Sequence, residues 1–261
     1  MAGITENPGT PRWGITTMPQ FEGKKALILN GAFFASIVTM FAEAGFERAT
    51  TVDDADVVVF TGGVDVDPEY YGAERHKMTQ TPNKDRDFYE KAVYEEALEQ
   101  GKIMFGICRG FQFLAVMNGG TLWQDVDGHA GPDHDIYDCE GDVIVTATSY
   151  HHQMVALDAK MEVLAVCPNQ ISRRFESDTM KLTIGAQNDC EVEIEAAYWK
   201  DTKCLGVQGH PEVGNAEYRS WCMSQLEDAF EGHLFDTERP SEAVGEDIES
   251  KMEMWRAAAL M

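Results

Sequence analysis

Cys108 is the residue of this sequence best placed to act as a nucleophile. It lies in the segment GICRG, directly after an apolar, strand-like run and directly before a helix-like one. In α/β enzymes, a nucleophile flanked by glycines at such a junction sits on a tight turn that lifts its side chain above the sheet edge. The alternative interpretation is a small buried cysteine, because free cysteine packs as a modest hydrophobe.

A cysteine nucleophile needs a base, and the base needs a group that orients it. The segment LGVQGHPE supplies both, as His210 and Glu212 at the end of a strand-like run. Pro211 favours an extended conformation at His210, in which residues two apart point to the same side. Glu212 could therefore hold the imidazole in its working tautomer, although the motif alone also fits a turn with a solvated histidine.

Two backbone N–H groups are candidates for an oxyanion hole. The helix predicted after Cys108 would offer the N–H of Arg109 at its N-terminus, where the helix dipole also favours a thiolate. The strand-like run ADVVVFTGG ends at Gly62 and Gly63, where the backbone can approach a ligand without an intervening Cβ. We predict the Gly63 N–H as the second donor; the alternative is an ordinary Gly-Gly turn.

Strand and helix patterns alternate in the first half of the chain, which predicts a parallel sheet with helices on both faces and an α/β fold. The strand candidates are 24–31, 55–63 and 102–107, and the helix candidates are 33–44, 85–100 and 109–118. From Asp142 onward the pattern changes to closely spaced strands at 142–148, 161–167, 181–187, 192–199 and 203–209, followed by a helix at 217–231. These later strands predict either strands added to the sheet or a small added β section, within the same domain.

The chain divides into three predicted segments. Residues 1–23 form a lead-in, residues 24–234 the catalytic domain, and residues 235–261 an acidic tail. Val244, Ile248, Met252 and Trp255 recur in the tail at helical spacing. An amphipathic helix is therefore expected there, docked on the body of the protein or on a partner.

Composition excludes several classes of function. The formal net charge of -24 disfavours nucleic acids and anionic membranes as partners, because the long-range field has the wrong sign. No segment reaches the ~20 apolar residues of a membrane span, and the N-terminus lacks the pattern of a signal peptide. The six cysteines are widely spread without a C-x-x-C pair, which argues against a disulfide scaffold or a zinc finger and favours a cytoplasmic location.

Four motifs in a fixed order, TGGVDVDPEYYG, GICRGFQFLAVMNGGTLWQD, TSYHHQMV and LGVQGHPE, resemble those of the class I glutamine amidotransferase superfamily. The chain is most similar to the stand-alone γ-glutamyl hydrolase-like branch, which includes γ-glutamyl-γ-aminobutyrate hydrolase. The similarity runs from about Lys24 to Glu217. It implies a flavodoxin-like fold with a mostly parallel central sheet and helices on both faces.

The resemblance also implies a role for each matching residue. Cys108 would be the nucleophile, His210 the general base and acid, and Glu212 the third member of the triad, with the backbones of Gly63 and Arg109 forming the oxyanion hole. The γ-glutamyl substrate would be held by Gln112, Ser149, Tyr150 and His151. His152 and Gln153 belong to the same motif, as support for the loop or as substrate contacts. No metal and no organic cofactor is implied.

Two departures from the family pattern bear on substrate choice. Gly209 stands where an aromatic residue often precedes the catalytic histidine, which would open the pocket or change what it accepts. The segment 167–189 does not follow the usual short connection, so the side of the site that holds the leaving group is expected to differ.

Some polar groups outside these motifs have a simpler interpretation. The stretch 128–142, rich in histidine and aspartate, is predicted to be a solvated loop rather than a metal site, because its spacing fits no specific ligand set. Asp65 and Asp67 could bind a substrate amino group but more simply cap their own loop. Arg173 and Arg174 could bind a leaving-group carboxylate, with a surface role as the default.

Three functions remain open at this level. The first is a hydrolase of a γ-glutamyl amine or peptide, which forms and then hydrolyses a γ-glutamyl thioester. The second is a glutaminase subunit that supplies ammonia to a separate synthetase partner. The third is a catalytically silent binding protein of the same fold. The expected partners are a small γ-glutamyl substrate and, in addition, a synthetase or further copies of the chain.

Overall fold

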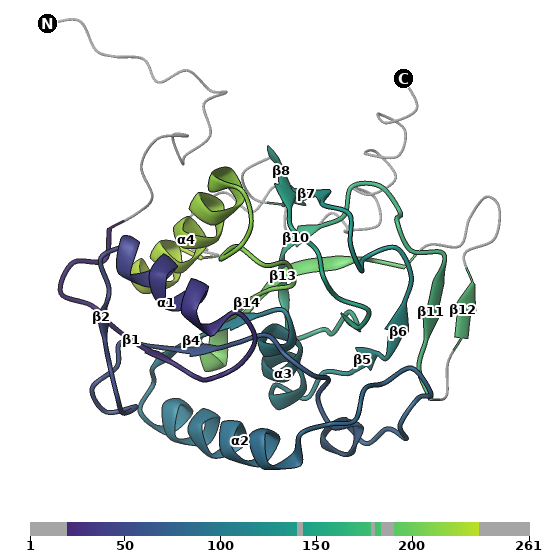
Figure 1. Ribbon diagram of the computed structural model, residues 1–261, viewed down its shortest axis with the longest axis horizontal. Helices are drawn as coiled ribbons and strands as arrows, with labels where there is room; N and C mark the ends of the chain where they lie inside the picture. Colours follow the sequence, from purple (N-terminus) through teal and green to yellow (C-terminus); the bar gives the residue numbers. More distant parts are fainter. Residues whose placement is uncertain (1–19, 140–142, 179–180, 184–190, 235–261) are drawn as a thin grey trace, which may run out of the picture.

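A nine-stranded mixed sheet forms the centre of the protein (Figure 1). The structure is a computed structural model, and it describes residues 20–139, 143–178, 181–183 and 191–234. The strand order is β2-β1-β3-β4-β14-β13-β10-β7-β8. The bounds are β1 Lys25–Ile28, β2 Glu47–Arg48, β3 Val57–Phe60, β4 Ile103–Ile107, β7 His134–Asp138, β8 Val143–Ala147, β10 Glu162–Val166, β13 Ile194–Trp199 and β14 Cys204–Val207.

The sheet has a parallel half and an antiparallel half. β2, β1, β3, β4 and β14 run parallel to one another, whereas β13, β10, β7 and β8 continue the sheet in antiparallel pairs. The later strands predicted from the sequence thus mostly extend the central sheet. The α/β fold with helices on both faces is confirmed. Three of the four motifs lie at strands of the parallel half, and TSYHHQMV follows β8 in the antiparallel half.

Four helices cover the two faces of the sheet: α1 Phe34–Glu43, α2 Lys84–Glu99, α3 Arg109–Met117 and α4 Ala216–Glu231. α1 and α4 lie on one face, and α2 and α3 lie on the other (Figure 1). Phe21, which the sequence prediction placed in the lead-in, packs against Phe46 in the core. Residues 1–19 and the tail 235–261, with its predicted helix, lie outside the described residues.

Two small sheets flank the central sheet. β5 Leu122–Trp123 pairs with β9 Met154–Val155, and β6 Asp125–Val126 pairs with β11 Arg174–Glu176, which pairs with β12 Lys181–Thr183. Two short 3-10 helices, Pro68–Tyr71 and Lys200–Thr202, complete the described elements. Within the described ranges, no helix combines the length and the apolar character needed to cross a bilayer.

The prediction of a solvated loop over 128–142 is wrong for residues 134–138, and residues 140–142 lie outside the described residues. Residues His134–Asp138 form β7, which pairs with β8 on one side and with β10 on the other. Its polar side chains find partners inside the protein; the buried Asp138 carboxylate, for example, accepts a hydrogen bond of 2.9 Å from the Trp221 indole on α4. Burial of polar side chains is favourable here because distant residues satisfy them, which the local sequence does not reveal.

Glycines let α3 approach the sheet closely. A Cβ on Gly110, in the first turn of α3, would lie 2.0 Å from the Phe60 carbonyl oxygen of β3. A Cβ on Gly206, in β14, would lie 2.0 Å from the Phe111 ring. Neither position leaves room for a methyl group, so both glycines are required by packing rather than by turn geometry.

We expect Gly110→Ala to lower the free energy of unfolding by roughly 1–3 kcal/mol, the usual cost of overpacking. Helix propensity alone predicts the opposite sign, a gain of about 1 kcal/mol. Ala92→Gly, at an exposed position of α2, is the matched control and should cost about 1 kcal/mol through propensity. Urea denaturation of both variants measures the difference, and a stabilised Gly110→Ala protein would contradict the packing argument.

Candidate active site

The register of the parallel strands brings the candidate residues to one edge of the sheet. β4 pairs with β14 so that Ile107 lies opposite Val207, and with β3 so that Phe60 lies opposite Gly106. The residues that follow each strand therefore meet at the same carboxyl edge, where α/β proteins bind ligands. Segments about a hundred positions apart in the sequence become neighbours in this way.

Cys108 occupies a strained turn between β4 and α3. Its φ of 53° and ψ of -110° lie in a region that residues with a Cβ rarely adopt. Its N–H donates a 2.9 Å hydrogen bond to the Val207 carbonyl of β14, and its own carbonyl accepts a hydrogen bond from the Gln112 N–H. The turn is thus held from the sheet and from the helix, as the predicted nucleophile turn requires.

His210 lies between Cys108 and Glu212. Its Nδ1 is 2.8 Å from the Glu212 carboxylate, and the Cys108 thiol lies close enough to the ring to help raise its pKa. The His210 backbone N–H donates to the Thr148 carbonyl, which fixes the start of the turn. All three side chains are largely buried. The structure therefore brings together the sulfur, the imidazole and the carboxylate that the sequence proposed as a triad.

The surroundings of His210 favour its protonated form. Burial lowers the pKa of the ring, but the hydrogen bonds and charges of Cys108 and Glu212 outweigh it and raise the pKa to about 10. A cationic imidazole beside the sulfur favours a thiolate, which is the reactive form of cysteine. The ring can also give its proton to a leaving amine.

The Gly62–Gly63 segment, which carries the second proposed oxyanion donor, lies beside His210. A Cβ on Gly62 would be 3.1 Å from Cε1 of His210, and Gly63 has a φ of +146°. Arg86 of α2 fixes this segment, because its guanidinium donates 2.9 Å hydrogen bonds to the carbonyls of Gly62 and Thr61. The orientation of the Gly63 N–H therefore depends on a side chain that the sequence analysis did not single out.

Arg109 has a second, structural role through its side chain. The guanidinium is buried and forms ion pairs with Asp87 and Glu90 of α2. Glu90 also accepts a 2.8 Å hydrogen bond from Arg86. One buried charge network thus ties both proposed oxyanion donors to α2. The i,i+4 spacing of Arg86 and Glu90 was visible in the sequence, but their burial was not.

A cavity opens beside Cys108 and contains most of the predicted substrate residues. Its lining consists of Gly63, Asp65, Gln80, Cys108, Arg109, Gln112, Tyr150, His151, His152 and Gln153. Ser149 lies apart from this lining, since its buried hydroxyl donates a 2.6 Å hydrogen bond to the His129 carbonyl. The Gln112 amide donates to the Gln153 carbonyl at 3.0 Å, which ties α3 to the loop that carries Tyr150 and His151.

The two adjacent histidines of the pocket have different charges. Burial and the neighbouring His129 lower the pKa of His151 to about 3, so its ring is neutral. A hydrogen bond with Asp65 raises the pKa of His152, and Asp125 adds to the shift. Asp65 contacts His152 at 3.3 Å, so the cavity carries a carboxylate next to an imidazole whose protonation it favours.

Phe33 and Gly209 show how the pocket differs from the sequence expectation. Phe33 has a φ of 54°, and its half-exposed ring lies edge-on to His210 at 5.2 Å and 6.4 Å from Tyr150. Sequence analysis had assigned it only to a helix. Gly209 does not open the pocket, because a Cβ there would lie 2.6 Å from the Tyr218 hydroxyl and 2.9 Å from the Thr148 carbonyl. Tyr218 of α4 fills this space.

Comparison with known proteins agrees with this geometry. The family model described as Peptidase C26 matches residues 26–212, which contain the turn at Cys108 and the other two proposed triad residues, His210 and Glu212. The chain belongs to the peptidase C26 family. The resemblance to class I glutamine amidotransferases is therefore confirmed, and membership supports an enzyme that acts on amide bonds as a hydrolase or an amidotransferase.

Individual relatives share only a minority of their residues with this chain. A Mycobacterium tuberculosis protein named as a "putative glutamine amidotransferase" is 32% identical over 200 residues, which is 70% of this chain and 58% of that protein. The carbamoyl phosphate synthase small chain of Vibrio parahaemolyticus is 28% identical over 66% of this chain and 36% of its own. The structure of PurLQS from Thermotoga maritima shares the fold, with a TM-score of 0.51 and 16% identity over 81% of this chain and 99% of that one.

The raised pKa of His210 predicts a pH-dependent stability. Because the pKa is about 10 in the folded protein against 6.5 for an unperturbed ring, the folded state binds the proton more tightly. This stabilisation is complete below pH 6.5 and is lost as the pH rises through about 10.

We therefore expect the free energy of unfolding to fall across this window less steeply in His210→Gln than in the parent protein. Urea denaturation at several pH values measures the slopes. His233→Gln, which removes a more exposed histidine, should follow the parent. Equal slopes in the parent and in His210→Gln would show that the ring gains no proton affinity on folding.

Proposed function

We propose that this protein hydrolyses a γ-glutamyl amide bond through a thioester on Cys108. The observation that carries the proposal is the contact of Cys108 with His210, whose Nδ1 is held by Glu212. The placement of this triad on a strained strand-to-helix turn supports a nucleophile rather than a buried structural thiol.

The chemistry proceeds in two steps. The Cys108 sulfur attacks the γ-carbonyl carbon, and the Gly63 and Arg109 N–H groups stabilise the oxyanion of the tetrahedral intermediate. His210 gives its proton to the leaving amine as the C–N bond breaks, which leaves a γ-glutamyl thioester. The neutral ring then takes a proton from water, whose oxygen attacks the thioester. Glutamate leaves, and the thiolate and the imidazolium are restored.

The charges of the cavity fit the amino-acid end of a γ-glutamyl group. Asp65 is buried and lines the pocket, so its carboxylate is the candidate partner for the substrate ammonium. His152, whose pKa is raised by Asp65 and Asp125, is the candidate partner for the α-carboxylate. Gln112 and Tyr150 line the same pocket as these two groups and Cys108.

A glutaminase subunit is the second candidate. It is favoured by similarity to a protein named as a carbamoyl phosphate synthase small chain and by the shared fold with PurLQS. In that case the same thioester chemistry would act on glutamine, and the ammonia would pass to a synthetase. The triad geometry serves both functions equally, so the leaving group and the need for a partner distinguish them.

Steady-state hydrolysis of glutamine and of a panel of γ-glutamyl amines and peptides tests the proposal. We expect the chain alone to release glutamate from members of the panel faster than from glutamine. Weak turnover alone and strong glutamine turnover only with a synthetase present would support the second candidate. No turnover of any member, with no adduct from a glutamine-derived electrophile on intact mass analysis, would support the silent binding protein.

The triad predicts graded losses of activity. Cys108→Ser should abolish turnover, because the alkoxide is not favoured by the surroundings that favour a thiolate. Glu212→Gln should lower kcat by roughly 10²–10⁴-fold, because the ring loses the carboxylate that fixes its tautomer. Glu217→Gln, an exposed carboxylate at the start of α4, is the matched control and should keep full activity. Full activity in Glu212→Gln would remove Glu212 from the triad.

Arg86 is predicted to be a positioning residue for the oxyanion hole. In Arg86→Met, the carbonyls of Thr61 and Gly62 lose their donors, so kcat should fall by up to roughly 10²-fold with little change in KM. Arg86→Lys should recover part of the loss, since an ammonium can bond one carbonyl but not both. The control is Arg48→Met, at an exposed position of β2. A change confined to KM or to thermal stability would contradict the positioning role.

A further inference from the structure

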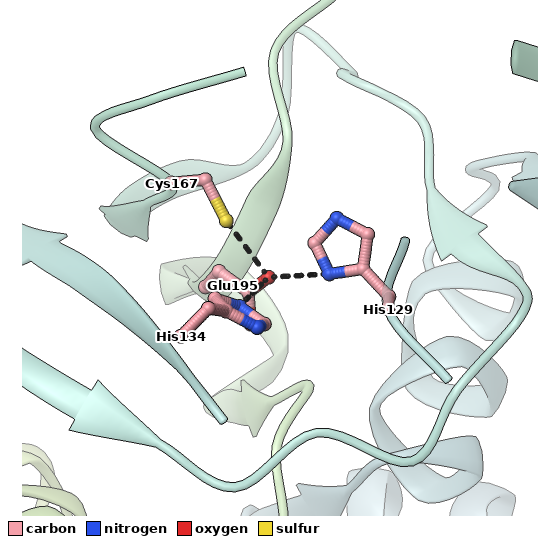
Figure 2. A group of neighbouring side chains, drawn as sticks. All are labelled: His129, His134, Cys167 and Glu195. Carbon is pink, nitrogen blue, oxygen red and sulfur yellow. Dashed lines mark hydrogen bonds and ion pairs between the residues drawn. The ribbon is translucent and has the colours of Figure 1, made fainter. Parts of the chain in front are cut away.

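Four potential metal ligands converge at a second site, in the antiparallel half of the sheet (Figure 2). His129 precedes β7, His134 begins it, Cys167 directly follows β10, and Glu195 lies in β13. Their ligand atoms all lie within 4.8 Å of one another, and three of the four residues are buried while His134 is nearly so. Figure 2 shows the sulfur and the imidazoles directed toward the Glu195 carboxylate.

The distances match the edges of a small coordination polyhedron. From Oε1 of Glu195, Nε2 of His134 lies at 3.0 Å, Sγ of Cys167 at 3.3 Å and Nδ1 of His129 at 3.5 Å. In a tetrahedral zinc site, bonds of about 2.0–2.3 Å place neighbouring ligand atoms roughly 3.3–3.8 Å apart. The three distances lie in this range or just below it, and every pair of ligand atoms lies within 4.8 Å, which is close to the spacing of four ligands around one ion.

The hydrogen bonding of His129 directs Nδ1 toward this centre. Its Nε2 lies 3.2 Å from the Glu193 carboxylate and donates to it. That carboxylate also accepts hydrogen bonds from the backbone N–H groups of Ile171 and Ser172. Nδ1 therefore faces the cluster, and it has no hydrogen-bond partner among the described residues. A carboxylate that orients a histidine in this way is the usual outer-shell support of a metal ligand.

Two buried polar atoms of the cluster lack a hydrogen-bond partner within the described chain. These are Nδ1 of His129, which lies 3.5 Å from Oε1 of Glu195, and Oε2 of Glu195. Buried polar atoms without a partner are costly, and a bound ion would satisfy both. The cluster therefore has the donor atoms, the burial and the unsatisfied ligand atoms of a cation site.

We propose that His129, His134, Cys167 and Glu195 bind one divalent metal ion of the zinc type. Two imidazole nitrogens, one thiolate and one carboxylate are ligands that Zn²⁺ accepts in tetrahedral geometry. The thiolate and the carboxylate together balance the charge of the ion, so the loaded site is neutral in its buried surroundings. Binding releases the ligand protons of Cys167 and His134 to solvent.

The site is structural and supports the wall of the catalytic pocket. The His129 carbonyl accepts hydrogen bonds from the Ser149 hydroxyl at 2.6 Å and the His151 N–H at 3.2 Å. The rings of His129 and His151 lie 4.7 Å apart. The ion would join β7, β10 and β13 to the segment that positions His151, while the chemistry at Cys108 proceeds without it. The proposal therefore stands whether or not the proposed function holds.

Cobalt spectroscopy tests the site directly. The full chain is prepared as Cys108→Ser, so that the active-site sulfur cannot bind metal, and is stripped with a chelator before titration with Co²⁺ and then Zn²⁺. We expect one equivalent of Co²⁺ to give the intense visible bands of tetrahedral coordination and a thiolate charge-transfer band, and one equivalent of Zn²⁺ to displace it. Absence of a stoichiometric spectrum in the folded protein would overturn the proposal.

Three variants in the Cys108→Ser background locate the ligands. Cys167→Ser should lose the charge-transfer band, whereas Cys139→Ser, which changes a half-buried cysteine just after β7, should keep it. Glu193→Gln should weaken the affinity roughly 10–100-fold, as expected for an outer-shell partner. A band that survives Cys167→Ser would contradict the assignment.

X-ray absorption of the zinc-loaded Cys108→Ser protein provides a measurement that needs no change to the cluster. One sulfur and three nitrogen or oxygen ligands are expected. A shell without sulfur would overturn the proposal even if Cys167→Ser does not fold. Thermal denaturation should show that Zn²⁺ raises the unfolding temperature of the parent and of Cys139→Ser.

Discussion

The close approach of α3 to the parallel sheet is the constraint on which the site depends. Gly106 and Gly206 leave no space for a methyl group between β4, β14 and the first turn of α3, and Gly110 seats that turn against β3. The helix can therefore begin immediately after the strand, which forces Cys108 into a φ of 53°. The strained backbone of Cys108 is maintained because packing on both sides of the turn leaves it no room to relax. A looser junction would let the turn relax and the sulfur move away from His210.

Buried polar networks hold the site from two opposite sides. On the side of α2, Arg86, Asp87, Glu90 and Arg109 fix the glycine segment and the start of α3. On the side of the antiparallel strands, the His129 carbonyl fixes the segment that carries Ser149 and His151. Side chains locked by such partners keep reacting groups in place without rearrangement during the reaction. The catalytic edge is thus rigid for reasons that lie outside the triad.

Features that depend on neighbouring residues or on the family motifs could be predicted from the sequence. Features that depend on contacts between residues distant in the sequence could not. The turn at Cys108, the alternation of strands and helices and the match to the family were accessible because each depends on neighbouring residues. The strand at 134–138 was missed because its polar side chains resemble a solvated loop until Trp221 and Glu195 are placed beside them. Likewise, nothing near Gly209 in the sequence indicates that Tyr218 fills the adjacent space.

The environments of three described cysteines explain why Cys108 is the proposed nucleophile. Burial raises the pKa of Cys204 to about 11 and raises that of Cys222 well above its usual value. These two sulfurs lie in the apolar core, where they act as small hydrophobic groups. Cys108 instead meets a histidine held cationic by a buried carboxylate. Reactivity follows from that charge, because the thiolate attacks a carbonyl far faster than the thiol.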